Sequence, residues 1–154
     1  MSNNSTSAAA KPNPALNPLS ILIGEWDALG KHPYFPGTVL RGKASFKWLE
    51  GGAFIIMRAS IAHEQFPAGI AIFGSDGSSE EYDMIYFDER EVSRKYTATL
   101  KNNVFNWWRN DADFSQRFTC IISQDGNSIV SKGEMSKDGK AWEEDLELTY
   151  TRIL

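Results

Sequence analysis

Hydrophobic and polar residues alternate one by one over most of this chain. In the segment 142–153, Leu146, Leu148 and Tyr150 fall on one side with Arg152, and acidic residues and threonines fall on the other. Successive side chains of a β-strand point to opposite faces, so a period of two predicts strands with one dry and one wet face. The segments 93–101 and 115–123 repeat the pattern. One dry face is typical of antiparallel sheets.

Turn signals divide the chain into short segments. They are Gly51-Gly52, Asp76-Gly77, Glu89-Arg90-Glu91, Asn102-Asn103, Asn110-Asp111, Asp125-Gly126 and Asp138-Gly139. Such residues tolerate the positive φ angles of tight hairpin turns. The strand candidates are residues 25–29, 38–48, 54–62, 69–74, 81–88, 93–101, 104–109, 115–123, 128–136 and 142–153. Short hairpins without long crossovers predict an all-β fold, a closed antiparallel up-and-down barrel of about ten strands.

The two ends of the pattern support closure of the barrel. Gly24-Glu25-Trp26 opens the first strand candidate, and Thr149-Tyr150-Thr151-Arg152 lies in the last. In a closed meander the first and last strands pair, so Trp26 is expected to stack under Arg152 as a cation–π pair. Residues 16–23 are expected to form a short N-terminal helix that plugs one end.

Composition and charge limit the classes of partner that the protein is expected to bind. The chain has 154 residues, a net charge of −4 and a single cysteine, Cys120. An acidic chain of this size predicts one domain without nucleic-acid or membrane partners. Residues 1–15 are rich in small and polar residues, which predicts a disordered tail before a single barrel domain over 16–154. With no signal peptide and no possible intrachain disulfide, we expect a cytoplasmic protein. An outward-facing tryptophan makes a homodimer possible.

Several longer runs resemble one family. They are residues 48–54 (WLEGGAF), 86–88 (YFD), 94–96 (RKY), 107–109 (WWR), 114–118 (FSQRF) and 138–143 (DGKAWE). These runs are similar to an uncharacterised group of small bacterial lipocalin-like proteins of the calycin superfamily. The resemblance covers roughly residues 16–154. It implies a calycin barrel and no established activity. Gly24-Glu25-Trp26 and the closing Arg152 resemble the lipocalin first-strand motif and the arginine packed over its tryptophan.

Nitrobindin, a haem-binding calycin, is a more distant relative by this resemblance. It holds its iron through a histidine late in the chain. Here the histidines are His32 and His63, both in the first half. The positions of the histidines therefore argue against haem binding of the nitrobindin type. We expect no cofactor and no metal, because two histidines and one distant cysteine do not show the spacing of metal ligands.

Polar side chains fall among apolar ones on several strands. If they converge inside a barrel, a buried charge requires a partner or a ligand. The first hypothesis is a protein that binds a small hydrophobic or amphipathic molecule, with Phe54 also in the wall. Arginine would hold an acidic head through its planar fork. The candidate ligand-binding residues are Arg58, Tyr86, Arg94, Tyr96, Trp107, Gln116, Phe118 and Glu144.

Three alternatives stay open at this point. Arg94 could instead pair internally with Glu144 or Asp88 and hold the barrel in shape. The barrel could be filled by its aromatic side chains and serve as an interaction or structural module. It could also be a cavity enzyme of the isomerase or hydrolase type, with an acid or base drawn from Asp88, Glu144, His32 and His63. No catalytic residue is identified by the sequence.

Overall fold

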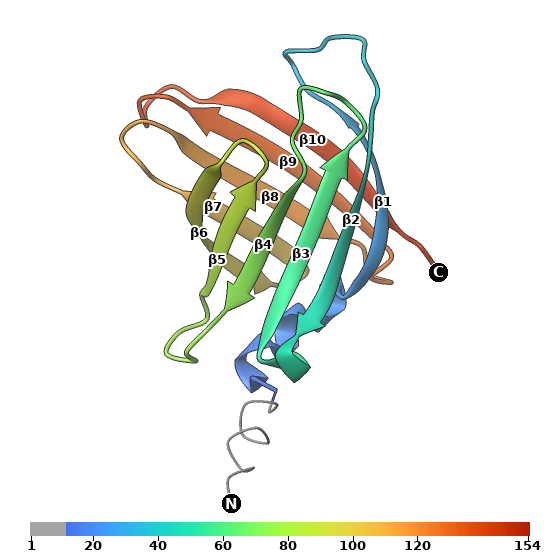
Figure 1. The fold of residues 1–154 in the computed structure, drawn as a ribbon, viewed down its shortest axis with the longest axis vertical. Helices are drawn as coiled ribbons and strands as arrows, with labels where there is room; N and C mark the ends of the chain where they lie inside the picture. The colour runs from blue at the N-terminus through green and yellow to red at the C-terminus, as the bar shows by residue number, and fades with distance from the viewer. Residues whose placement is uncertain (1–11) are drawn as a thin grey trace, which may run out of the picture.

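The protein is described by a computed structural model that covers residues 12–154. Its elements are η1 (Pro14–Leu22), β1 (Gly24–Lys31), β2 (Leu40–Leu49), η2 (Glu50–Gly52), β3 (Phe54–Ile61), β4 (Gly69–Gly74), β5 (Tyr82–Asp88), β6 (Val92–Lys101), β7 (Val104–Arg109), β8 (Ser115–Ile122), β9 (Ser128–Ser136) and β10 (Glu143–Arg152). Each strand pairs antiparallel with the next, and β1 pairs with β10 (Figure 1). The predicted ten-stranded closed barrel is confirmed.

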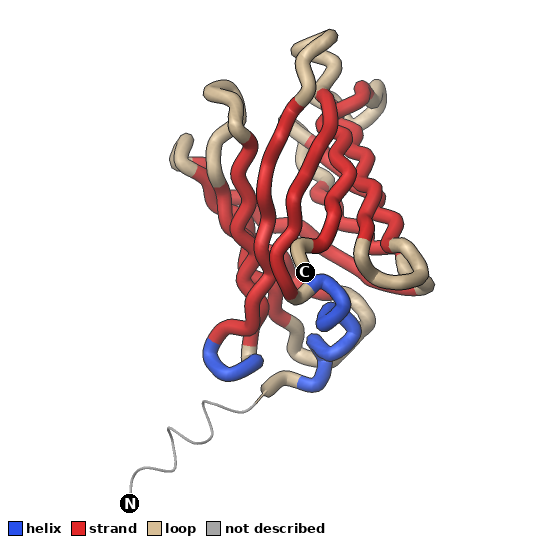
Figure 2. The backbone as a smooth tube through the Cα atoms, turned by 90° about the vertical axis from the view of Figure 1, so that its right-hand side faces the viewer, coloured by secondary structure: helices blue, strands red, loops and turns tan. Residues whose placement is uncertain are grey.

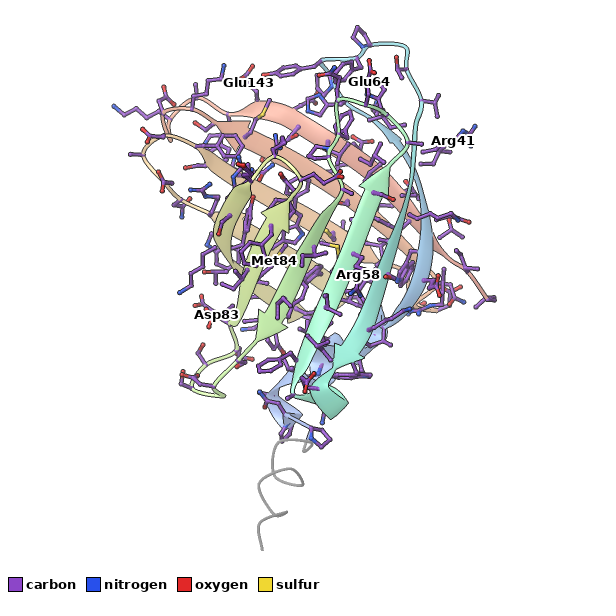
Figure 3. The ribbon with its side chains drawn as sticks, in the orientation of Figure 1. Arg41, Arg58, Glu64, Asp83, Met84 and Glu143 are labelled. Carbon is purple, nitrogen blue, oxygen red and sulfur yellow. The ribbon has the colours of Figure 1, made fainter. Side chains whose placement is uncertain are left out.

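Alternation along the strands separates the interior from solvent, as predicted. On β5, Met84 is buried and its neighbour Asp83 is exposed, which can be followed in Figure 3. Tyr96 on β6, Phe118 on β8 and Leu148 on β10 are buried inside. Removing such apolar side chains from water is the main favourable contribution to folding.

The N-terminal helix closes one end of the barrel (Figure 2). The element η1 is a 3-10 helix, and its Leu16, Leu19 and Leu22 are almost completely buried. A 3-10 helix has three residues per turn, so residues three apart share one face. The side chain of Asn13 caps the helix by accepting a hydrogen bond from the backbone N–H of Ala15 at 3.0 Å. The helix begins inside the predicted tail, and residues 1–11 of that tail lie outside the described part of the chain.

Trp26 and Arg152 hold this closed end together. They are cross-strand partners, and the Arg152 guanidinium carbon lies 4.2 Å from the Trp26 ring centroid. Arg152 also donates hydrogen bonds to the carbonyl oxygens of Ile21, Ile23 and Gly126, while the Trp26 indole N–H donates to that of Leu22. The cation–π pair predicted from the two chain ends is confirmed, and it also satisfies carbonyls at the helix C-terminus.

The opposite end, here called the mouth, is formed by the loops 32–39, 62–68, 89–91, 110–114 and 137–142. At this end β10 contains a bulge, because its pairing with β9 shifts register between Glu144 and Glu147. Gly30 of β1 lies against the bulge, where a Cβ would collide with the carbonyl oxygen of Glu147. The bulge changes which side chains of β10 face the interior.

Candidate functional site

The interior of the barrel is hollow. It contains a cavity of about 540 Å³ that reaches from Leu22 and Trp26 at the closed end to the loops at the mouth. Several apolar side chains point inward but are only half-buried, among them Met57, Tyr86 and Trp107. Their remaining exposed surface faces the cavity. The volume lies within the range that holds one small organic molecule.

One wall of the cavity is a row of aromatic side chains on adjacent strands. Tyr86 meets Tyr96 edge-to-face at 6.2 Å between ring centroids, and Tyr96 meets Trp107 in the same way at 5.1 Å. Trp107 stacks flat on Phe118 at 4.0 Å. We call these four residues the aromatic row. Contacts of this kind between rings stabilise the arrangement beyond the area that they bury.

Small side chains on β1, β2 and β3 line the cavity across the barrel from β6 to β8, together with larger ones such as Phe46 and Met57. Gly69 on β4 does not belong to them, because the Tyr86 ring lies over it, 3.0 Å from where a Cβ would be. Ala28, Ala44 and Ala59 are here called the small-residue wall, in which Ala44 and Ala59 are direct cross-strand partners. Because these residues project so little into the barrel, the space between the two walls is left open. The cavity is thus a direct consequence of which residue types the inner positions carry.

The loops 32–39 and 62–68 lie over the mouth as an aromatic cluster. Phe35 and Phe66 meet at 5.6 Å between centroids, and His32 meets Phe66 at 5.8 Å. His63 packs on the outer side of this pair, 4.7 Å from Phe35. Tyr34, Phe35, Gln65, Phe66 and Pro67 all contribute to the lining of the cavity. These two loops therefore shape the entrance.

A chain of hydrogen bonds runs from the mouth into the cavity. Nε2 of His32 lies 3.0 Å from Oδ1 of Asp145, and Nε2 of Gln116 donates to Oδ2 of Asp145 at 2.7 Å. The Tyr96 hydroxyl donates to Oε1 of Gln116 at 2.5 Å. Nδ1 of His32 accepts from the backbone N–H of Tyr34, so the neutral ring carries its proton on Nε2 and donates to Asp145. Both ring nitrogens of His32 are thus engaged.

Asp145 is a functional candidate that sequence reasoning missed. Strict alternation places it outside with Glu143, but its side chain is only 10% exposed and lines the cavity. The bulge in β10 is the cause, since it turns both Asp145 and Leu146 inward. A β-bulge has no sequence signal here, although the run Glu143-Glu144-Asp145 interrupts the apolar alternation.

Within residues 12–154, two arginines line the mouth of the cavity, Arg90 and Arg94, and only Arg90 takes part in an ion pair. Arg90 binds Asp88 through two hydrogen bonds of 3.1 and 2.7 Å, and the Tyr86 hydroxyl donates to the same carboxylate at 2.8 Å. The hydrogen bonds from Arg90 lower the pKa of Asp88 to about 2. Burial, and then the bond to Asp88, raise the pKa of Tyr86 well above its usual range. The charge of Arg90 is therefore paired with Asp88, which also accepts the hydrogen bond of the Tyr86 hydroxyl.

Arg94 lies across from Tyr86 on β6 and also lines the cavity. Its guanidinium carbon lies 4.7 Å from the centroid of the Phe114 ring. Among residues 12–154 it takes part in no ion pair, whereas Arg90 and Arg109 are bound to Asp88 and Asp111. A half-buried positive charge therefore faces the cavity without a carboxylate partner.

Six of the eight predicted site residues converge on the cavity: Tyr86, Arg94, Tyr96, Trp107, Gln116 and Phe118. Arg58, for which the sequence left the inward face of its strand open, does not line the cavity: Met57 and Ala59 face it, and Arg58 lines a groove on the outer surface (Figure 3). Phe54 and Glu144 are exposed and do not line the cavity either. Phe54 points outward because it lies on the same face of β3 as Arg58. Glu144 points outward because of the bulge in β10.

The proposed internal partners of Arg94 are not bound to it. Glu144 is exposed, and Asp88 is held by Arg90. Asp88 and Glu144 therefore do not form the acid–base pair considered from the sequence, since one is bound by Arg90 and the other is exposed. His63 stays in the loop cluster with its Nδ1 accepting from the backbone N–H of Gln65. The arrangement thus brings together binding groups rather than the acid–base residues considered from the sequence.

Cys120 faces the cavity beside Ser131, to which its thiol donates a hydrogen bond at 3.4 Å. Burial raises the pKa of this thiol to about 11. A thiol with so high a pKa is a poor nucleophile near neutral pH. Within the described residues, no three His, Cys, Asp or Glu side chains are grouped closely enough to bind a metal ion. None of the helices in residues 12–154 combines the length and apolar character needed to cross a bilayer.

Comparison with known proteins supports the fold. No family model and no curated protein matches the sequence. The structure is similar to that of Rv2717c from M. tuberculosis, with a TM-score of 0.66 and 14% identity over 94% of this chain and 100% of that one. It is also similar to the S-type phycobiliprotein lyase CPES from Guillardia theta, with a TM-score of 0.57 and 8% identity over 88% and 90% of the two chains. The likeness shows a calycin-like barrel fold, in agreement with the sequence. Membership of the bacterial lipocalin-like family stays a prediction.

Proposed function

We propose that this barrel binds one small amphipathic molecule in its cavity, with an anionic head beside Arg94. The observation that carries the proposal is the half-buried guanidinium of Arg94, which faces the cavity without an ion-pair partner in the described chain. An anionic head would supply the missing charge through paired N–H donors. Gln116 and Tyr96 lie next to this position, so they would orient the head.

The apolar body of the ligand would lie deeper in the barrel. There the lining includes Phe73, Met84 and Phe105. Among residues 12–154 the one charged residue in this half of the lining is Lys43, whose amine is exposed on the outer surface and paired with Asp27. Each buried CH₂ group of a ligand contributes about 0.8 kcal/mol, so a chain of several carbons gives useful affinity. An apolar interior with a few polar groups near the entrance is the usual composition of a small-molecule site.

The hollow interior also bears on the other two hypotheses. A cavity of about 540 Å³ favours binding over a barrel filled by its own side chains. The separation of Asp88 from Glu144 and the engagement of both His32 nitrogens count against the acid–base chemistry considered above. Binding is therefore the function that the geometry supports best.

Native mass spectrometry tests the proposal first. We expect the purified protein to carry a mass excess that is lost on denaturation, or, if it is empty, to bind added decanoate with one-to-one stoichiometry by calorimetry. The Arg94→Leu variant should lose decanoate affinity by about tenfold or more, because a hydrogen-bonded charge pair is removed.

Arg58→Leu is the matched control, since Arg58 lies on the outer surface. It should bind decanoate as the unaltered protein does. Equal affinity of the Arg94→Leu and Arg58→Leu variants would show that the head does not lie at Arg94. A clean apo mass, together with no binding of decanoate or of the ring-bearing anion 1-anilinonaphthalene-8-sulfonate, would contradict the binding function itself.

A further inference from the structure

The position of the aromatic row depends on a glycine in the neighbouring strand. Gly133 on β9 is the cross-strand partner of Phe118 on β8. A Cβ built on Gly133 would lie 2.6 Å from Cζ and 2.9 Å from Cδ2 of Phe118, with Cε2 closer still. Only a residue without a side chain leaves room for the phenyl ring here, so the ring lies flat against the backbone of β9.

The backbone does not explain this glycine. Gly133 is not among the residues with positive φ, and it lies in the middle of a strand. A glycine in a strand interior weakens the strand and often marks a close approach of another group. The group that approaches is the ring of Phe118. Glycine is therefore required at position 133 by the space that this ring occupies and not by the backbone conformation.

The position of the Phe118 ring determines where the other rings of the aromatic row lie. Trp107 stacks on Phe118 with an interplanar angle of 11°, and Tyr96 meets Trp107 edge-on. If Phe118 moved inward, Trp107 could not keep its place, because the two rings are already 4.0 Å apart. The distance of the aromatic row from the small-residue wall is thus set at Gly133.

We propose that Gly133 is a specificity-determining residue of the cavity and that the ligand is a ring-bearing anion rather than a single acyl chain. The inference rests on the proposed binding function and concerns the cross-section of the same site. The small-residue wall at Ala28, Ala44 and Ala59 leaves a broad space opposite the row. Trp107 is only half-buried and presents aromatic surface to that space, which suits contact with a flat ring system.

Two anionic probes of different width test the inference: decanoate, which is narrow, and 1-anilinonaphthalene-8-sulfonate, which carries two ring systems. We expect the unaltered protein to bind both. In Gly133→Ala the affinity for the naphthalene probe should fall about tenfold, while decanoate affinity changes by less than about threefold, because overpacking narrows the site. The double variant Gly133→Ala with Phe118→Leu should recover the wide probe, since the shorter side chain removes the collision.

Gly74→Ala is the matched control. Gly74 also lies in a strand, and a Cβ there meets only an ordinary contact of 3.8 Å with Phe54. It should bind both probes as the unaltered protein does. Near-UV circular dichroism of each variant confirms that the probes report a folded barrel.

The outcomes separate the two proposals. Unchanged binding of the naphthalene probe by a folded Gly133→Ala variant overturns the role of Gly133, and an unaltered protein that binds decanoate alone overturns the ring-bearing ligand. An unaltered protein that binds neither probe contradicts the proposed function instead. Should Gly133→Ala fail to fold, Phe118→Leu alone answers the question: it widens the site, so affinity for the larger bis-anilinonaphthalene probe should rise, and an unchanged affinity overturns the inference.

Discussion

Nε2 of His32 and Oδ1 of Asp145 lie 3.0 Å apart, although the two residues are separated by 113 positions in the chain. Their contact joins the loop that follows β1 to the bulge in β10 at the mouth of the barrel. The side chains are only 8% and 10% exposed. A hydrogen bond to a charged acceptor is stronger than average in so dry a place.

Removing this carboxylate should destabilise the protein. In Asp145→Ala the N–H groups of His32 and Gln116 lose their acceptor. We expect the free energy of unfolding in urea to fall by about 2–4 kcal/mol, since the donors of the buried His32 and the half-buried Gln116 are left without their acceptor. Amide hydrogen exchange in residues 32–39 should quicken, because the loop loses its attachment. Glu143→Ala, at an exposed position of the same strand, should change stability by less than about 0.5 kcal/mol. Equal stability of the two variants would show that Asp145 does not hold the loop.

Arg152 should be one of the most sensitive positions at the closed end. Arg152→Leu removes the donors to the carbonyls of Ile21, Ile23 and Gly126 as well as the cation–π contact with Trp26. The expected loss is about 2–4 kcal/mol in the free energy of unfolding. The comparison is Arg117→Leu, because Arg117 stacks on Trp142 at 3.7 Å but is about half exposed. That variant should lose about 1 kcal/mol or less. If Arg152→Leu lowered the free energy of unfolding only slightly, the packing of η1 alone would account for the stability of this end.

Acid stability should report on Asp88. The folded protein lowers the pKa of this group to about 2, whereas an unfolded aspartate has a pKa of about 3.9. A lowered pKa stabilises the folded state above the unfolded value, and the contribution disappears as the pH falls from about 4 to 2. The difference in unfolding free energy between the unaltered protein and Asp88→Asn should therefore shrink by about 2 kcal/mol between pH 5 and pH 2. A difference that stays constant over this range would contradict the pairing with Arg90.

Much of the cavity wall could be predicted from local patterns. Tyr96, Trp107 and Phe118 face inward because their strands alternate without interruption, and period two then assigns every side chain once one is known to be inside. The placement of Arg58 could not be derived in this way. Strand β3 reads Phe-Ile-Ile-Met-Arg-Ala, which carries apolar residues on both faces, so the pattern does not say which face is inside.

The sequence by itself determined the strands, their turns and the closure of the barrel. These features depend on residues that are neighbours in the chain: alternating side chains, glycine and asparagine at turns, and a tryptophan and an arginine at the two ends of the pattern. Only the tertiary structure decided that Asp145 faces inward and that Gly133 makes room for Phe118. The reason is physical. Each depends on the register between strands or on a bulge, and pairing across strands depends on packing between residues distant in the chain.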